Sequence, residues 1–255
     1  MPQTLAQKIL QAHTDDVIER DGQIVQCRLS LVLANDITGP LAIKSFKGMG
    51  ASRVFDKDKI ALVMDHFTPQ KDIASANQVM ISRQFAQEQG ITHYYEGGDC
   101  GVEHTLLPER GLVGPGDVVI GADSHTCTYG GIGAFATGMG STDIAAGMAL
   151  GETWIKVPPT IRVNINGQMP KWLRGKDLML LLIKAIGVDG ALYKALEFGG
   201  SVIDALPVEG RLTMANMAIE AGGKVGLFAV DELTRQYCAE HGRPGVTMSL
   251  SLIHI

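Results

Sequence analysis

The sequence predicts an α/β fold in which largely parallel sheets are covered by helices on both faces, giving three α/β/α layers. Short runs of consecutive apolar residues, such as 60–64 and 118–120, are typical of strands buried on both faces. Segments with helical spacing, such as 72–88, alternate with these runs. The chain has 255 residues and is 45% hydrophobic, so it can bury a sizeable core.

The first part of the chain is expected to form an α/β domain over residues 1–157. Its expected elements are a helix over 4–12, a strand over 24–33, a helix from Pro40, a strand over 60–64, a helix over 72–88, a strand over 91–95, a short helix or turn over 102–108, a strand over 118–120 and a helix over 141–150.

A second α/β domain is expected over residues 158–248, after a hinge at Val157-Pro158-Pro159. Its expected elements are a strand over 160–167, a helix over 176–186, a strand over 193–198 and a helix over 212–221. This second domain is predicted to be truncated, because few elements follow residue 229. The last seven residues, 249–255, complete no element and are expected to be a non-native tail.

Composition narrows the class of protein. The net charge of -5 and the isoelectric point near 5.8 give no electrostatic footprint for nucleic acid. No apolar run is long enough to span a bilayer, and the polar N-terminus lacks the apolar region of a signal peptide. The four cysteines form no C-x-x-C pair, so reduced thiols are expected. We expect a cytoplasmic protein that acts on a small molecule, with neither nucleic acid nor a membrane as partner.

The strongest candidate site is Asp123-Ser124-His125, which follows the predicted strand over 118–120. Open α/β sheets bind ligands at the carboxyl ends of their strands. The alternative is a capping cluster that satisfies helix amides. The glycine-rich run 129–133 behind it lacks both the dinucleotide-binding and the P-loop spacing, so we predict that it serves tight packing and turning.

Other candidates lie elsewhere along the chain. Asp65-His66 follows the predicted strand over 60–64, where a carboxylate can orient a histidine for acid–base catalysis, although an ordinary strand-end pair is the alternative. His104 is a weaker candidate. Asn216 and Glu220 are four residues apart and share one face of an otherwise apolar helix.

These residues alone leave two kinds of chemistry open. His66, His104 and His125 could together hold a zinc ion for hydrolysis. Ser124 beside a histidine could act as a nucleophile, although the Gly-x-Ser-x-Gly pattern is absent. Spacing alone does not decide between them.

Five ordered stretches resemble the aconitase superfamily and, within it, the large subunits of 3-isopropylmalate dehydratases. They are 33–40 (LANDITGP), 64–66 (MDH), 101–104 (GVEH), 121–126 (GADSHT) and 213–222 (TMANMAIEAG). The large subunits of homoaconitases, which belong to lysine biosynthesis, are similar enough to remain an alternative. The fold implied is an aconitase-like set of α/β/α domains, here incomplete.

The resemblance implies a hydro-lyase that isomerises 2-isopropylmalate and 3-isopropylmalate through an alkene, in leucine biosynthesis. It also implies a [4Fe–4S] cluster, one iron of which acts as a Lewis acid on the leaving hydroxyl. A separate small subunit with the swivelling domain would supply the catalytic base and help to bind the di- or tricarboxylic hydroxy acid.

Individual residues take roles from the same resemblance. His66 would protonate the leaving hydroxyl, and Asp65 would orient His66. Asp123 and His125 would hydrogen-bond the iron-bound water or hydroxide. Ser124 would help to set this geometry.

The resemblance also pairs His104 with Glu220 and puts Asn216 beside the cluster. The family's cluster cysteines lie in a Cys-Thr-Asn segment and a C-x-x-C pair, and neither occurs in this sequence. Cys127 is not at a ligand position and is interpreted as a small buried thiol. We therefore expect an amino-terminal part of a hydro-lyase large subunit, inactive alone. A fragment that only docks partners is the remaining alternative.

Overall fold

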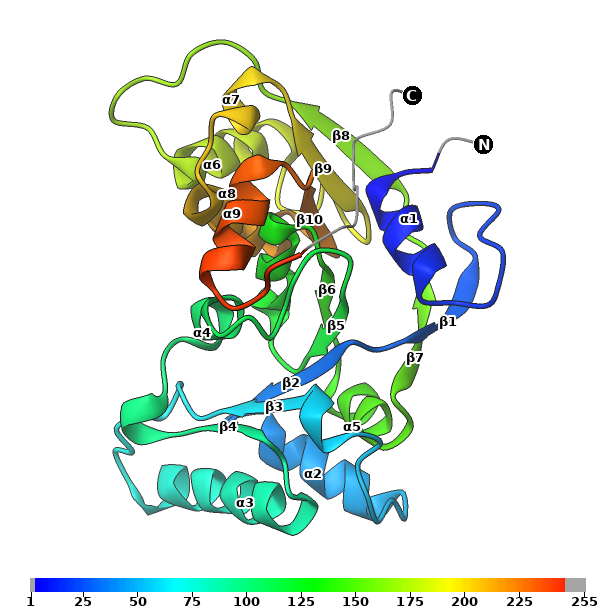
Figure 1. The fold of residues 1–255 in the computed structure, drawn as a ribbon, viewed down its shortest axis with the longest axis vertical. Helices are drawn as coiled ribbons and strands as arrows, with labels where there is room; N and C mark the ends of the chain where they lie inside the picture. Colours follow the sequence, from blue (N-terminus) through cyan, green and yellow to red (C-terminus); the bar gives the residue numbers. More distant parts are fainter. Residues whose placement is uncertain (1–2, 246–255) are drawn as a thin grey trace.

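The computed structural model describes residues 3–245. A five-stranded parallel sheet extends from the middle of the molecule into its lower half in Figure 1. Its strands lie in the order β4-β3-β2-β5-β6, and every neighbouring pair is parallel. They are β2 (Leu31–Asn35), β3 (Ile60–Val63), β4 (His93–Tyr95), β5 (Val118–Gly121) and β6 (Phe135–Gly138). The predicted parallel α/β architecture is confirmed.

Helices α2 (Gly39–Gly48), α3 (Ile73–Gln89) and α5 (Ser141–Leu150) form a layer on one face of this sheet. Neighbouring residues of β2 enter different core clusters: Val32 packs with this helical layer, and Leu33 packs with the opposite face. That opposite face is covered by α4 (Glu103–Glu109), the 3₁₀ helix η3 (Ser124–Ile132) and α8 (Val208–Asn216). Strands buried on both faces account for the continuous apolar runs.

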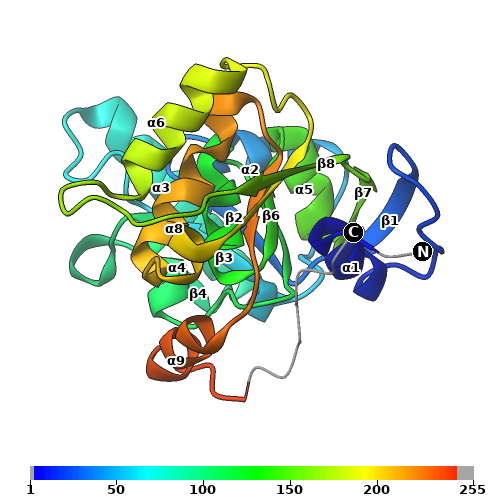
Figure 2. The same cartoon turned by 90° about the horizontal axis from the view of Figure 1, so that it is seen from above.

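A second, three-stranded parallel sheet lies in the upper half of Figure 1, in the order β10-β9-β8. Its strands are β8 (Thr160–Asn164), β9 (Ala195–Gly199) and β10 (Val225–Phe228), and its further helices are α6 (Gly175–Ile186), α7 (Ser201–Asp204), the 3₁₀ helix η4 (Met217–Ala221) and α9 (Glu232–Glu240). The view from above shows α6 and α8 over this sheet (Figure 2). The division of the chain at residue 157 stays a prediction, and the proposed tail over 249–255 lies outside the described residues.

Local chemistry explains the helices that the sequence predicted best. Thr4 caps α1 (Leu5–Ala12), accepting a hydrogen bond from the backbone N–H of Gln7. Asp72 caps α3 in the same way through the N–H of Ser75, and Gly90 ends that helix with a φ of 67°. The predicted helices over 4–12, 72–88, 141–150 and 176–186 are confirmed.

The single strand predicted over 24–33 is wrong. The chain instead forms β1 (Ile24–Arg28) and then β2, because the two strands join different sheets. β1 pairs antiparallel with β7 (Glu152–Lys156), and its residues alternate between exposed and buried. The helix predicted over 212–221 is also divided, since α8 ends at Asn216 and η4 follows. Strands β6, β7 and β10 and helices α7 and α9 were not predicted.

The glycine-rich run packs η3 directly between the two sheets. A Cβ on Gly130 would lie 1.9 Å from the carbonyl oxygen of Gly226 in β10. A Cβ on Gly131 would lie 2.6 Å from the backbone of Leu212 in α8. The prediction of tight packing is confirmed, and this contact joins the first half of the chain to the second. Within residues 3–245, no helix has both the length and the apolar character needed to cross a membrane.

Replacing Gly130 with alanine is expected to lower the free energy of unfolding by about 1–3 kcal/mol, because the new methyl group overlaps the backbone of β10. Gly98→Ala is the matched control, since no atom lies within 4 Å of a Cβ there. That control should change stability by less than about 0.5 kcal/mol. Urea denaturation measures both variants, and equal stability of the two would contradict this packing.

Candidate active site

The predicted site residues meet at the carboxyl ends of three central strands. β2 lies between β3 and β5, and the chain runs outward through β3 and β4 before it returns to β5 on the other side. This reversal is the topological switch point, at which open α/β sheets bind ligands. Asp36 follows β2, Asp65 follows β3 and Asp123 follows β5, so each strand delivers a carboxylate to one crevice.

Asp65 and His66 form a hydrogen-bonded pair. His66 Nδ1 lies 2.7 Å from Asp65 Oδ1, and Asp65 Oδ2 accepts the backbone N–H of Glu103 at 2.7 Å. Asp36 fixes the same loop by accepting the backbone N–H groups of His66 and Phe67. The ring of His66 therefore has one defined orientation, with Nδ1 toward Asp65. The predicted orienting contact of Asp65 on His66 is present in the structure.

Asp123 is the centre of the cluster. Its Oδ1 lies 3.0 Å from His104 Nε2 and accepts the backbone N–H of His125 at 2.7 Å. Its Oδ2 lies 3.6 Å from His66 Nε2. Burial acts to raise the pKa of Asp123, but the hydrogen bonds from His104 and the His125 N–H outweigh it and lower the pKa to about 2. Asp123 is therefore ionised and faces three histidine rings, because His125 Nδ1 also lies 3.6 Å from its Oδ1.

The predicted pairing of His104 with Glu220 is wrong. Glu220 Oε1 instead lies 3.1 Å from His125 Nε2, and His104 pairs with Asp123. The reason is packing: η4, which carries Glu220, lies against η3, which carries His125. The ring of His104 also packs against the ring of Tyr129, and the two ring centroids are 5.9 Å apart.

Ser124 and Asn216 have supporting places. Ser124 Oγ lies 3.2 Å from His125 Nδ1, so it can donate to that ring while Glu220 engages the other nitrogen. Asn216 Nδ2 donates to Thr128 Oγ1 at 2.9 Å and so fastens the end of α8 to η3. The predicted site residues are thus brought together in one region.

A three-histidine zinc site is not formed. Within the described part of the chain, each group of side chains close enough to share an ion contains only one histidine. His66, His104 and His125 face Asp65, Asp123 and Glu220, respectively. The histidines are organised as separate hydrogen-bonded pairs, not as a shared coordination sphere.

The cysteines in residues 3–245 do not fit a [4Fe–4S] cluster. Cys27 is in β1, Cys127 in η3 and Cys238 in α9, and Cys100 follows the 3₁₀ helix η2 (Gly97–Asp99). None belongs to a group of neighbouring metal-binding side chains. Burial raises the pKa of Cys127 to about 12, which opposes the thiolate that a cluster needs. The interpretation of Cys127 as a buried thiol is confirmed.

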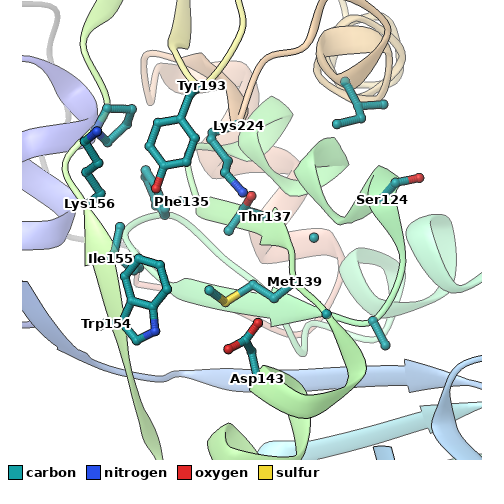
Figure 3. Close-up of a pocket in the computed structure, with 15 residues that line it drawn as sticks. Ser124, Phe135, Thr137, Met139, Asp143, Trp154, Ile155, Lys156, Tyr193 and Lys224 are labelled. Carbon is teal, nitrogen blue, oxygen red and sulfur yellow. The ribbon is translucent and has the colours of Figure 1, made fainter. Parts of the chain in front are cut away.

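A cavity of about 460 Å³ adjoins the cluster beside Ser124 (Figure 3). Tyr193 lies between Lys156 and Lys224, whose Nζ atoms are 5.6 and 5.2 Å from its ring centroid. In Figure 3 the Lys224 side chain reaches toward Thr137. None of the three paired histidines lines this cavity, so the acid–base centre lies next to it and not inside it.

Sequence reasoning did not select three residues that complete the cluster. Asp36 follows β2 in the same way that Asp65 follows β3, and this similar position could have identified Asp36 as a site residue. Glu103 lies next to His104 and is fully buried. Tyr129 was not selected because it is part of the glycine-rich run. Its hydroxyl donates a hydrogen bond to the carbonyl oxygen of Glu103 at 3.2 Å.

The chain is similar to the large subunits of 3-isopropylmalate dehydratases. The large subunit of 3-isopropylmalate dehydratase from Desulfovibrio desulfuricans is 84% identical over 251 residues, which are 98% of this chain and 60% of that protein. The same subunit from Nitratidesulfovibrio vulgaris (strain Miyazaki F) is 72% identical over 98% of this chain and 60% of its own length. The large subunit from Moorella thermoacetica is 60% identical over 93% of this chain and 56% of its own length.

The chain therefore spans about 60% of the length of the curated relatives that it matches. The family model of the aconitase family (aconitate hydratase) matches residues 7–251. This match includes every histidine–carboxylate pair described above. The chain belongs to the aconitase family.

Proposed function

We propose that this chain supplies acid–base groups of a hydro-lyase that interconverts 2-isopropylmalate and 3-isopropylmalate. The observation that carries the proposal is the set of three histidine–carboxylate pairs at the switch point, whose histidines all face Asp123. Dehydration and rehydration need groups that give and take protons beside one carbon framework. The names of the similar large subunits support this choice of reaction.

His66 is the proton donor in this proposal. Its Nδ1 is engaged by Asp65, so Nε2 is the nitrogen that can exchange a proton with a leaving hydroxyl. About a third of its side chain is exposed, at 34%, whereas that of His104 is 12% exposed. His66 is therefore more accessible than His104, and His125, which is 36% exposed, has both ring nitrogens engaged by Ser124 and Glu220.

Asp123 and His125 would bind the water that leaves and returns. Asp123 is ionised and accepts hydrogen bonds, while His125 is held between Ser124 and Glu220. His104 keeps Asp123 in place through the 3.0 Å contact. Asn216 acts farther back, by fixing α8 against η3.

The rest of the site would come from outside these residues. The relatives are longer, and in the proposal their additional length holds a [4Fe–4S] cluster that polarises the substrate hydroxyl as a Lewis acid. A separate small subunit would supply the catalytic base, as the name "large subunit" of the relatives suggests. The free cysteines agree with a reducing cytoplasm, in which we place the protein.

A chimeric enzyme tests the function. Residues 1–245 would be joined to the remaining part of the Desulfovibrio desulfuricans relative and produced with that organism's small subunit. We expect the chimera to convert 3-isopropylmalate to the unsaturated acid, followed by ultraviolet absorbance, and the present chain alone to show no turnover. The control is the intact relative.

Two outcomes would contradict this assignment. One is a chimera with full iron and sulfide content that does not turn over 3-isopropylmalate. The other is a preference for homocitrate-type acids, which would favour the homoaconitase alternative.

The role of His66 predicts a specific kinetic loss. In the chimera, His66→Gln should lower kcat by about 10²–10⁴-fold with little change in KM, because glutamine can hydrogen-bond but cannot carry the proton. His93→Gln is the matched control, since His93 lies in β4 outside the cluster. Steady-state kinetics would measure both variants. Retention of more than about a tenth of kcat in His66→Gln would rule out the proton-donor role.

A further inference from the structure

Glu103 is a buried acid that the proposed chemistry does not use. It is the first residue of α4, and its side chain is 1% exposed. Its Oε1 accepts one hydrogen bond, from Asn35 Nδ2 at 3.1 Å. Its Oε2 is buried and has no hydrogen-bond partner in the structure. A carboxylate in this position would be charged, desolvated and nearly without donors, which is costly.

The groups that face Glu103 add to this cost. Asp36, Asp65 and Asp123 approach from the ends of β2, β3 and β5, and all three carboxylates oppose a further negative charge. The nearby groups able to carry positive charge are His66 and His104. Both are already engaged by carboxylates, at 2.7 Å from Asp65 and 3.0 Å from Asp123.

Glu103 and Asp123 approach the same nitrogen. His104 Nε2 lies 3.0 Å from Asp123 Oδ1 and 3.7 Å from Glu103 Oε1. A neutral Glu103 leaves the N–H of His104 to Asp123. A charged Glu103 would compete for that N–H and would repel Asp123 from its place.

We propose that Glu103 is a positioning residue that carries a proton at neutral pH, and that its lack of charge keeps His104 paired with Asp123. The consequence for turnover rests on the proposed hydro-lyase function, whereas the protonation of Glu103 and the pairing of His104 do not. The site would then work with Glu103 neutral and lose its arrangement when Glu103 ionises.

The direction of the pH dependence follows from burial. Burial, and next the charge of Asp65, raise the pKa of Glu103 from 4.5 to about 9, although the Asn35 hydrogen bond opposes the shift. Between these two pH values the folded chain holds a proton that the unfolded chain releases. The contribution of Glu103 to stability therefore decreases as pH rises through this window.

The first test uses this chain without any turnover. Carbon-13 NMR of labelled glutamate side chains should show one carboxyl that is protonated at about pH 7 and titrates only in alkaline solution. Nitrogen-15 shifts of the His104 ring should change over the same pH range. A Glu103 carboxyl that is already ionised at about pH 7, or a His104 ring that does not respond when Glu103 ionises, would overturn the proposal.

Two variants make the thermal test specific. Glu103→Gln keeps the shape and the neutral state, so its unfolding temperature should rise relative to the parent chain as pH increases from about 6 to about 9. Glu109→Gln, at the exposed end of the same helix, should follow the parent chain throughout. If Glu103→Gln also follows the parent chain, Glu103 is not a buried neutral acid. The NMR measurement on the parent chain decides the question if Glu103→Gln fails to fold.

The kinetic test separates this inference from the proposed function. In the chimera, kcat/KM should fall in alkaline solution, and Glu103→Gln should move that fall to higher pH. An unchanged alkaline limb in an active chimera would overturn the positioning role. A chimera without turnover, together with the expected NMR titration, would contradict the proposed function and leave the protonation of Glu103 established.

Discussion

The hydrogen bonds received by the Asp123 carboxylate hold the site together. Asp123 lies two residues after β5, accepts the N–H of His125, pairs with His104 and faces His66 across 3.6 Å. These contacts lower its pKa to about 2, so it keeps a fixed negative charge at the switch point of the sheet. His104 of α4 is oriented by that charge, and His66, whose ring is fixed by Asp65, turns its Nε2 toward it. In our proposal this arrangement also requires that Glu103 is uncharged, because a second negative charge beside His104 would compete with Asp123 for the His104 N–H.

The geometry also depends on how closely the two halves of the chain approach. η3 lies under β10 and α8 because Gly130 and Gly131 leave no side chain between the backbones. The hydrogen bond from Asn216 to Thr128 fastens α8 to the same segment. Since η4 follows α8 directly, this packing brings Glu220 to His125. The third histidine pair is therefore a product of tertiary packing and not of local sequence.

Local sequence patterns predicted most elements of the fold. Helical spacing ended by Gly90 predicted α3, a run of small residues predicted α5, and uninterrupted apolar runs predicted β3 and β5, because these signals lie within single elements. The break between β1 and β2 could not be predicted, since β1 pairs with β7 more than a hundred residues later.

The site residues were found because they follow strands or match a family pattern. The partners of these residues were not all predicted. Glu220 pairs with His125 and not with His104, because the packing of helices decides this pairing and residue spacing does not encode it. Glu103 was missed because an acid at the start of a helix usually reads as an exposed, favourable charge.

A double-mutant cycle on the active chimera tests whether Asp123 joins His66 and His104 into one acid–base unit. The cycle would compare kcat/KM for Asp123→Asn, His104→Gln and the double variant, and then repeat the comparison with His66→Gln. Strong non-additivity is expected in both cycles, with each double variant little worse than its more damaging single change. Losses that add to within about 0.5 kcal/mol in both cycles would contradict it, because the residues would then act independently.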